Sequence, residues 1–347
     1  MSMKLQVVEG RTLAAQAAMD EAARRIAQRV HAVLVHGVAV GGASLHWLQG
    51  AHAQGWVRAD EAVPPSTVAG FEREWRSWHE RGFVPVDAAL LALAGPDCRL
   101  PGLSWDEQPP YDCALAAATG EPFGIYAIVD SASRLRQVLE AGITTVQLRI
   151  KQPADADAAW HVRLRGSLQE GIAAARAAGA LLFVNDHWRL AAELGGEAVH
   201  LGQEDLLALG STGRAELRAT GLALGVSSHA VWELCRARTL APRYIACGPV
   251  WPTTTKDMPW VPQGLDNLGW WSRVAGSPVV AIGGILRAEQ VEQTAAAGAS
   301  GVCVLRGLGD EPRAVVPALQ AAFELGRSRF HASSCPVWPH PTLEARA

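Results

Sequence analysis

The most constraining feature of this 347-residue sequence is an alternation, from Gly124 onward, of short β-branched runs with segments of helical apolar spacing. Eight such runs occur in about 185 residues, at 125–129, 145–148, 181–184, 198–201, 222–226, 244–247, 279–282 and 301–304. This alternation is typical of parallel strands joined by right-handed helical crossovers. Eight of them in this length suit a closed barrel, so we predict an α/β fold, a (βα)8 TIM barrel. An open doubly wound sheet is the alternative.

The chain is longer than one barrel requires, and single cores seldom exceed about 250 to 300 residues. Residues 12–30 are Ala-rich with helical apolar spacing, residues 32–35 form an apolar run, and residues 86–94 suggest a second helix. Glycines and prolines crowd residues 95–123, which indicates a connection. We therefore predict a smaller, mostly helical or α+β N-terminal domain over 1–120, the barrel over 121–327, and a flexible tail over 328–347.

The composition excludes several classes of partner. With 49% apolar residues, 19% charged residues and a net charge of -3, the chain has no broad field that would gather nucleic acid or anionic membrane. It shows no signal peptide and no run of about 18 apolar residues, so we expect a cytoplasmic protein. Its six cysteines contain no CxxC pair, which argues against a zinc or redox site. Whether the chain forms homo-oligomers stays open.

Polar residues follow most of the predicted strands, at the barrel end where active sites form. Arg149 and Lys151 alternate about Ile150 and so point the same way. Two adjacent cations repel unless an anion lies between them, although a solvated strand end is the alternative. Asp186 and Asp205 leave adjacent strands, which suits oxygen ligation of Mg²⁺, while either could simply cap a helix.

Glycines after the seventh strand, at 283–284, would let backbone N–H groups approach a phosphate. Together with the cations and carboxylates, they indicate two anionic substrates, with a metal on one of them. His229 could serve as a base. No carboxylate partner is apparent beside it, however, so a hydrogen bond within its loop is the preferred interpretation.

Six ordered segments resemble the thiamine phosphate synthase family, over about residues 122–325. They are VQLRIK at 146–151, VND at 184–186, VHLGQED at 199–205, GVS at 225–227, GPVWPTTTK at 248–256 and AIGGI at 281–285. The resemblance implies a transferase of thiamine biosynthesis. Such an enzyme couples 4-amino-2-methyl-5-hydroxymethylpyrimidine diphosphate to 4-methyl-5-(2-hydroxyethyl)thiazole phosphate and releases thiamine phosphate and diphosphate.

The resemblance also implies roles for individual residues. Asp186 and Asp205 would hold the Mg²⁺ cofactor, and the diphosphate would bind Arg149, Lys151, Asn185 and Lys256. Gln147 and Ser227 would orient the pyrimidine. The thiazole phosphate would be received by Thr253, Thr255, Gly284, Leu305 and Arg306.

Two departures from the family pattern stand out. Arg306 replaces the usual Ser of the last phosphate loop, and residues 257–263 carry an unusual Trp and two prolines. Two other functions share this pattern in part. One is a tautomerase of thiazole phosphate, which tends to lack the complete diphosphate set, and the other is a phosphate-ligand sensor without turnover.

Residues 1–120 carry no assignable activity. AVLVHG at 32–37 and LHWL at 45–48 faintly resemble a late segment of a pyrimidine phosphate kinase that occurs fused to this synthase. The Gly-Thr-Gly anion-binding turn of that kinase is absent. The working hypothesis is a degenerate or structural domain, or an interaction module.

Overall fold

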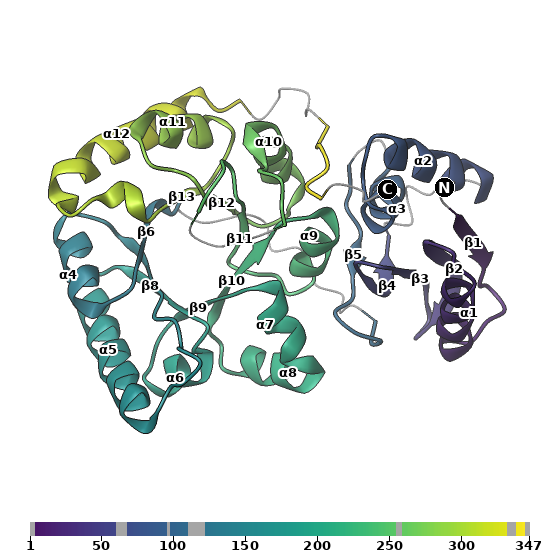
Figure 1. Ribbon diagram of the computed structural model, residues 1–347, viewed down its shortest axis with the longest axis horizontal. Coiled ribbons are helices and arrows are strands. Elements are labelled where there is room, and N and C mark those ends of the chain that lie inside the picture. Colours follow the sequence, from purple (N-terminus) through teal and green to yellow (C-terminus); the bar gives the residue numbers. More distant parts are fainter. Residues whose placement is uncertain are drawn as a thin grey trace.

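The computed structural model describes residues 4–59, 68–95, 98–109, 122–254, 259–331 and 338–343. Within these residues, the second part of the chain closes into an eight-stranded parallel barrel (Figure 1). Its strands are β6 (Gly124–Val129), β7 (Thr145–Leu148), β8 (Leu181–Asn185), β9 (Ala198–Leu201), β10 (Ala223–Ser228), β11 (Tyr244–Cys247), β12 (Val279–Ala281) and β13 (Gly301–Val304). Gly301 of β13 pairs with Gly124 of β6, which closes the barrel and rules out the open sheet. The predicted TIM barrel is confirmed.

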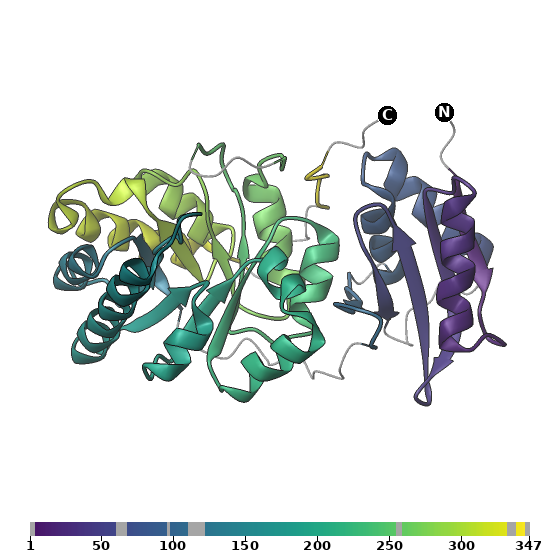
Figure 2. The ribbon, with the colours of Figure 1, turned by 60° about the horizontal axis from the view of Figure 1, so that its bottom comes forward.

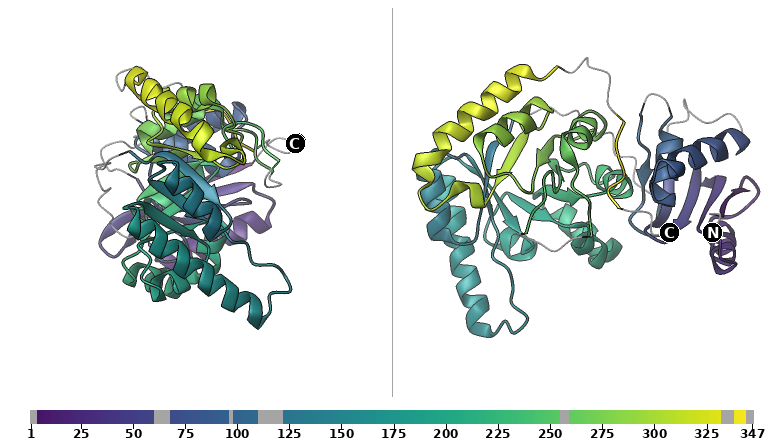
Figure 3. Two further views of the ribbon diagram at one scale, coloured as in Figure 1. Left: turned by 90° about the vertical axis from the view of Figure 1, so that its left-hand side faces the viewer. Right: turned by 45° about the horizontal axis from the view of Figure 1, so that its top comes forward.

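Helices surround the barrel as its crossovers, and Figure 3 shows α5 and α12 on the side away from the N-terminal domain. They are α4 (Ala132–Glu140), α5 (Ala158–Ala177), α6 (Trp188–Glu193), α7 (Gln203–Ala208), α8 (Gly210–Ala219), α9 (Val231–Arg238), α10 (Gly264–Val274), α11 (Ala288–Ala296) and α12 (Pro312–Arg329), with a 3-10 turn η1 (Arg306–Leu308). Alternate strand residues pack outward on these helices. Those facing inward form a separate interior cluster around Tyr126, Phe183 and Tyr244. Cys303 is buried in that cluster.

The N-terminal domain is an α+β layer structure, one of the two forms that we predicted. Its sheet runs in the order β1 (Leu5–Glu9), β2 (Ala32–Val40), β3 (Ala43–Gly50), β4 (Gln54–Arg58) and β5 (Gly102–Leu103), antiparallel except for the β1–β2 pair. Helix α1 (Ala15–Ala27) packs on one face, while α2 (Val68–Glu80) and α3 (Pro85–Ala94) lie on the other (Figure 2). Sequence analysis did not predict β3, β4 or α2.

The connection between the domains contains ordered structure. Residues of the Pro/Gly-rich stretch form β5, which pairs with β4, and Trp105 is buried against α9 of the barrel. Residues 110–121 lie outside the described residues, so the domain limits at 120–121 stay predictions.

Part of the expected flexible tail is packed. Helix α12 continues to Arg329, and residues 338–343 run between the barrel and the N-terminal domain (Figure 1). Trp338 makes an edge contact with Trp78 of α2 at 5.1 Å, and Asn267 of α10 binds the His340 backbone N–H at 2.8 Å. No helix among the described residues is long and apolar enough to cross a membrane.

Candidate active site

The parallel strands bring most of the predicted site residues to one rim of the barrel, the end at which strands terminate. Gln147 lies in β7 and Arg149 directly follows it, Asn185 ends β8, and Ser227 lies near the end of β10. Gly284 and Leu305 follow β12 and β13. Carboxyl ends of barrel strands form the active-site face in this architecture, so one rim offers cations, carboxylates and amides together.

The two predicted cations differ in their partners. Lys151 Nζ lies 2.7 Å from Asp186 Oδ2, with the two side chains 55% and 28% exposed, so the pair contributes little to stability. The Arg149 side chain forms no ion pair or hydrogen bond within the described residues, and its backbone N–H donates to Val129 O at 2.7 Å. The Arg149 guanidinium therefore keeps its hydrogen-bonding capacity for an anion.

Asp186 occupies an uncommon backbone conformation. Its φ is +64°, in the left-handed region, where Asp is one of the few residues other than glycine to be tolerated. The Asp186 N–H donates to His200 O of the neighbouring strand at 3.1 Å, and Asp186 O accepts from Trp188 N at 2.9 Å. These bonds hold the carboxylate at the rim. Its side chain does not cap α6, since that helix has no side-chain cap.

Asp205 does act as a helix-cap residue, which was the alternative interpretation. It is the third residue of α7, and its Oδ2 accepts from the Gly202 N–H at 2.9 Å. The Oδ1 atoms of Asp186 and Asp205 accept no hydrogen bond within the described residues. One free oxygen on each carboxylate is the donor chemistry that Mg²⁺ prefers. The described residues contain no group of three or more His, Cys, Asp or Glu side chains suited to a metal.

Asn185 provides a further indication of a ligand. The residue is buried to 4% exposure, yet its side-chain Nδ2 finds no hydrogen-bond partner among the described residues. A buried amide without a partner costs about 1–3 kcal/mol, which a bound oxygen would recover. Asn185 ends β8 directly before Asp186, so this donor lies at the same rim.

A buried hydrogen-bond chain crosses the barrel interior to Ser227. Tyr126 OH lies 2.9 Å from Tyr244 OH, which lies 2.6 Å from His200 Nδ1, and His200 Nε2 lies 2.8 Å from Ser227 Oγ. Burial lowers the pKa of His200 to about 4, so the imidazole is neutral and offers one donor and one acceptor. Gln147 joins the chain through its Nε2, 3.3 Å from Tyr126 OH. The chain thus links both residues predicted to orient the pyrimidine.

Sequence analysis missed the role of His200 and both tyrosines. The signal was available in part, because a polar residue at an inward-facing barrel position needs a partner in the core. The GVS motif also has a local reason: a Cβ on Gly225 would lie 2.6 Å from the Tyr244 OH.

His229 has a carboxylate partner, contrary to our sequence-based argument. Glu233 Oε2 accepts from the His229 backbone N–H at 2.6 Å and lies 2.9 Å from its Nδ1. The imidazole also stacks on Trp260 at 5.3 Å. His229 is therefore held within its loop, as preferred, but through Glu233. The spacing of four residues into α9 was the signal that could have revealed this pair.

The loops after β11, β12 and β13 approach one another at the proposed phosphate cup. Gly284 has φ +73°, and a Cβ there would lie 2.6 Å from Trp251 Cβ, so only glycine fits this backbone. Arg306, in η1 beside Leu305, donates to Thr254 Oγ1 at 3.2 Å and so joins two loops. Thr253 is half-buried in the same loop. Thr255 and Lys256 lie outside the described residues.

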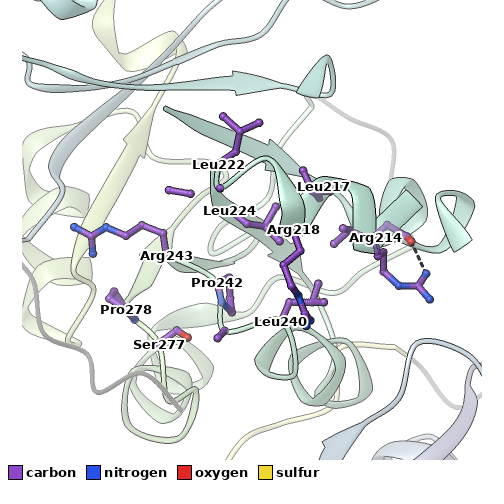
Figure 4. Close-up of a pocket in the computed structure, with 14 residues that line it drawn as sticks. Arg214, Leu217, Arg218, Leu222, Leu224, Leu240, Pro242, Arg243, Ser277 and Pro278 are labelled. Carbon is purple, nitrogen blue, oxygen red and sulfur yellow. Dashed lines mark hydrogen bonds between the residues drawn. The ribbon is translucent and has the colours of Figure 1, made fainter. Parts of the chain in front are cut away.

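The described pockets divide between the two ends of the barrel. One of about 260 Å³ lies at the rim and includes Asp186, His187 and Gln152. Another of about 400 Å³ lies at the opposite end, where β10, β11 and β12 begin, and is mostly apolar, with Arg214 and Arg243 at its edges (Figure 4). The chemistry-bearing residues lie at the rim, so we take the rim as the candidate site despite the smaller pocket there.

Comparisons with known proteins concern the barrel part of the chain. Residues 125–308 match the family described as Thiamine monophosphate synthase. The chain is 42% identical over 206 residues to the thiamine-phosphate synthase of Neisseria meningitidis serogroup A, covering 58% of this chain and 96% of that protein. It is 42% identical over 193 residues to the same-named protein of Rhizobium etli, covering 55% and 89%. A solved thiamine phosphate pyrophosphorylase from Pyrococcus furiosus is 26% identical with a TM-score of 0.50, covering 59% and 98%.

Proposed function

Because residues 125–308 make this chain a member of the thiamine monophosphate synthase family, we propose that it is a transferase acting on two phosphorylated substrates. It couples 4-amino-2-methyl-5-hydroxymethylpyrimidine diphosphate to 4-methyl-5-(2-hydroxyethyl)thiazole phosphate, and the products are thiamine phosphate and diphosphate. The observation that carries the chemistry is the Lys151–Asp186 contact at the rim, beside a guanidinium and a buried amide that have no side-chain partner.

The side chains at this rim suit the departure of diphosphate. Arg149 and Lys151 carry positive charge toward the leaving anion, and the Asn185 amide donates to one of its oxygens. Lys256 would add a third cation. Charge that develops on the diphosphate as the C–O bond breaks is stabilised by these groups, while the aminopyrimidine delocalises the methylene cation.

The carboxylates fit a magnesium site. Asp186 and Asp205 would hold Mg²⁺ through their free Oδ1 atoms, and the remaining ligands would come from water and the diphosphate. When bound, the ion supplies further neutralisation of the leaving anion. Lys151 shares Asp186 through the other carboxylate oxygen, which positions its ammonium beside the same anion.

The pyrimidine is oriented by Gln147 and Ser227 in this proposal. The neutral His200 holds Ser227 Oγ, and Tyr126 holds the Gln147 amide, so each group is fixed before substrate arrives. The attacking thiazole nitrogen has no proton to lose. No general base is therefore required, in keeping with the engagement of His229 by Glu233.

The thiazole phosphate would bind across the cup. The Gly284 N–H, the hydroxyls of Thr253 and Thr255, and the backbone at Leu305 are the proposed donors. Arg306 already bridges two of these loops, which supports a role for its guanidinium in the cup in place of the usual Ser.

The test is an assay of the purified full chain with both substrates and Mg²⁺, following thiamine phosphate and diphosphate together. Equimolar formation of the two products is expected. Conversion of thiazole phosphate to its tautomer without diphosphate release would indicate the tautomerase instead, and calorimetric binding without product would indicate a sensor. An Arg149→Ala variant should lose diphosphate release, whereas the exposed Arg163→Ala serves as the matched control.

A further inference from the structure

Helix α9 is enclosed on every side. All eight of its residues are buried, including Glu233, Arg236 and Arg238. It packs on β10 of the barrel and on α3 and β5 of the N-terminal domain. A crossover helix of a lone barrel would expose its polar face to water, so the N-terminal domain takes the place of solvent here.

The first turn of α9 is capped from the other domain. Its own N-cap residue is Ala230, which has no side-chain hydrogen bond to offer. Asp87 of α3 is 3% exposed, and its Oδ1 accepts from the Trp232 backbone N–H at 2.7 Å. The Asp87 carboxyl thereby caps the N-terminus of α9, as an N-cap side chain would, although Asp87 lies 145 positions before Trp232 in the sequence.

The last turn of α9 is held by the same domain. Trp105 Nε1 donates to Arg236 O at 3.0 Å and to Thr239 Oγ1 at 3.2 Å, which ties the end of the helix to the N-terminal domain. The Arg236 guanidinium donates to Ser104 O at 3.2 Å and to Gln54 O at 2.9 Å. Both helix ends therefore depend on residues outside the barrel.

This helix is directly coupled to the candidate site. Glu233 in its first turn holds His229, while Gln203 Nε2 donates to Ser228 Oγ and to Glu233 O, both at 3.0 Å. Ser227, the predicted pyrimidine contact, directly precedes Ser228 at the end of β10. A shift of the α9 first turn would move this loop with it.

We propose that the N-terminal domain is a fixed clamp on α9, with Asp87 as a positioning residue that sets the Ser227–His229 loop for the pyrimidine. His52 of the same domain supports the clamp by stacking on Trp232 at 5.5 Å. Burial raises the pKa of Asp87 to about 8, so a neutral amide of the same shape should replace it well. The kinetic part of the inference rests on the proposed function, while the clamp itself does not.

The experiment compares Asp87→Ala, Asp87→Asn and the exposed control Asp20→Ala in the full chain. We expect Asp87→Ala to raise KM for the pyrimidine diphosphate roughly fivefold to tenfold, the size of a lost cap, with KM for thiazole phosphate unchanged. Asp87→Asn should stay within about twofold of wild type. Hydrogen exchange followed by mass spectrometry should show faster exchange at residues 229–232 in the alanine variant alone.

An Asp87→Ala protein with wild-type exchange at 229–232 and wild-type KM values would overturn the clamp. If Asp87→Ala lowers activity equally at limiting concentrations of either substrate, and in proportion to the folded fraction, the variant is only destabilised, and that result would also overturn the clamp. Should the alanine variant not fold, Trp105→Phe removes the Nε1 donor to Arg236 O and Thr239 Oγ1 together with part of the buried indole ring at the other helix end. An unchanged pyrimidine KM and unchanged exchange at that end would count against the proposal. A wild-type chain that makes no thiamine phosphate would refute the proposed function, and the exchange measurement would still decide the clamp.

Discussion

Tyr244→Phe tests whether the buried chain behind Ser227 orients the site. The phenol oxygen is the link between Tyr126 and His200, at 2.9 Å and 2.6 Å. Its removal leaves His200 Nδ1 without a partner in a site that is 6% exposed, and it leaves almost no cavity. Stranding one buried polar group costs about 1–3 kcal/mol, which for a domain of this size lowers Tm by roughly 2–10 °C.

The activity should fall together with the stability, because an imidazole freed at Nδ1 no longer fixes Ser227 Oγ. We expect kcat/KM for the pyrimidine diphosphate to drop about threefold to tenfold, measured from initial rates beside calorimetric unfolding. Tyr126→Phe is the companion variant, because it leaves the His200–Tyr244 bond intact and instead removes the hydroxyl that holds the Gln147 amide. If Tyr244→Phe keeps the wild-type kcat/KM for the pyrimidine diphosphate, the hydrogen-bond chain through His200 does not orient Ser227.

Further predictions concern the cup, the metal and pH. Gly284→Ala should lower the free energy of unfolding, measured with a chemical denaturant, by about 2–4 kcal/mol and weaken thiazole phosphate binding, because φ is +73° and the new Cβ would lie 2.6 Å from Trp251 Cβ. The control Gly179→Ala, at φ +62° in open space, should lower it by only about 1 kcal/mol. Asp186→Asn should raise the Mg²⁺ concentration needed for half-maximal rate and lower kcat roughly a hundredfold, and equal Mg²⁺ titrations would contradict the metal site. Burial lowers the pKa of His200 to about 4, so between about pH 4 and 6.5 the unfolded chain binds a proton that the native state excludes. The free energy of unfolding should therefore rise with pH across that window, by up to about 3 kcal/mol from His200. The variant His200→Gln should show a smaller difference in the free energy of unfolding between pH 4.5 and pH 7. Asp87 has the opposite effect on the pH dependence of stability, because burial raises its pKa to about 8 and the native state keeps a proton that the unfolded chain loses above about pH 4. The free energy of unfolding should therefore fall as pH rises from about 4 to about 8, and Asp87→Asn should remove that decline.

The barrel was predictable because its signal is local. Each strand is a short apolar run bounded by turns, and the predicted run at 222–226 became β10, Ala223–Ser228, with a shift of only one or two residues. The N-terminal strands β3 and β4 escaped prediction for the opposite reason. The alternation in β3 covers only residues 43–47 before two apolar residues stand side by side, and β4 is a five-residue run that mixes glutamine and glycine with tryptophan. The buried Trp47 and Trp56 side chains pack edge to face across the two strands, a contact visible only after pairing.

In the candidate site, too, residues with a local sequence signal could be predicted, whereas contacts between residues distant in sequence could not. Residues that end strands, such as Asn185 and Asp186, could be assigned to one rim from topology alone. The Tyr126–Tyr244 contact joins positions 118 apart, and no local pattern reports such a pair. Glu233 was different, since it stands four residues after His229 at the start of a helix, and that spacing alone could have predicted the bond.

Helix α9 lacks features that a solvent-exposed helix would have, which supports a structural role for the N-terminal domain. A helix that begins after Ala230 has no side-chain cap of its own, and Arg236 and Arg238 stand on a helix that is otherwise apolar or small in its second half. In water those features would leave free N–H groups and place the guanidinium groups outward. Buried guanidinium groups are costly unless they are paired, and here they donate to carbonyls of Ser104 and Leu100. An uncapped crossover helix with arginines therefore indicates a partner surface, and in this chain the partner is the domain that precedes the barrel.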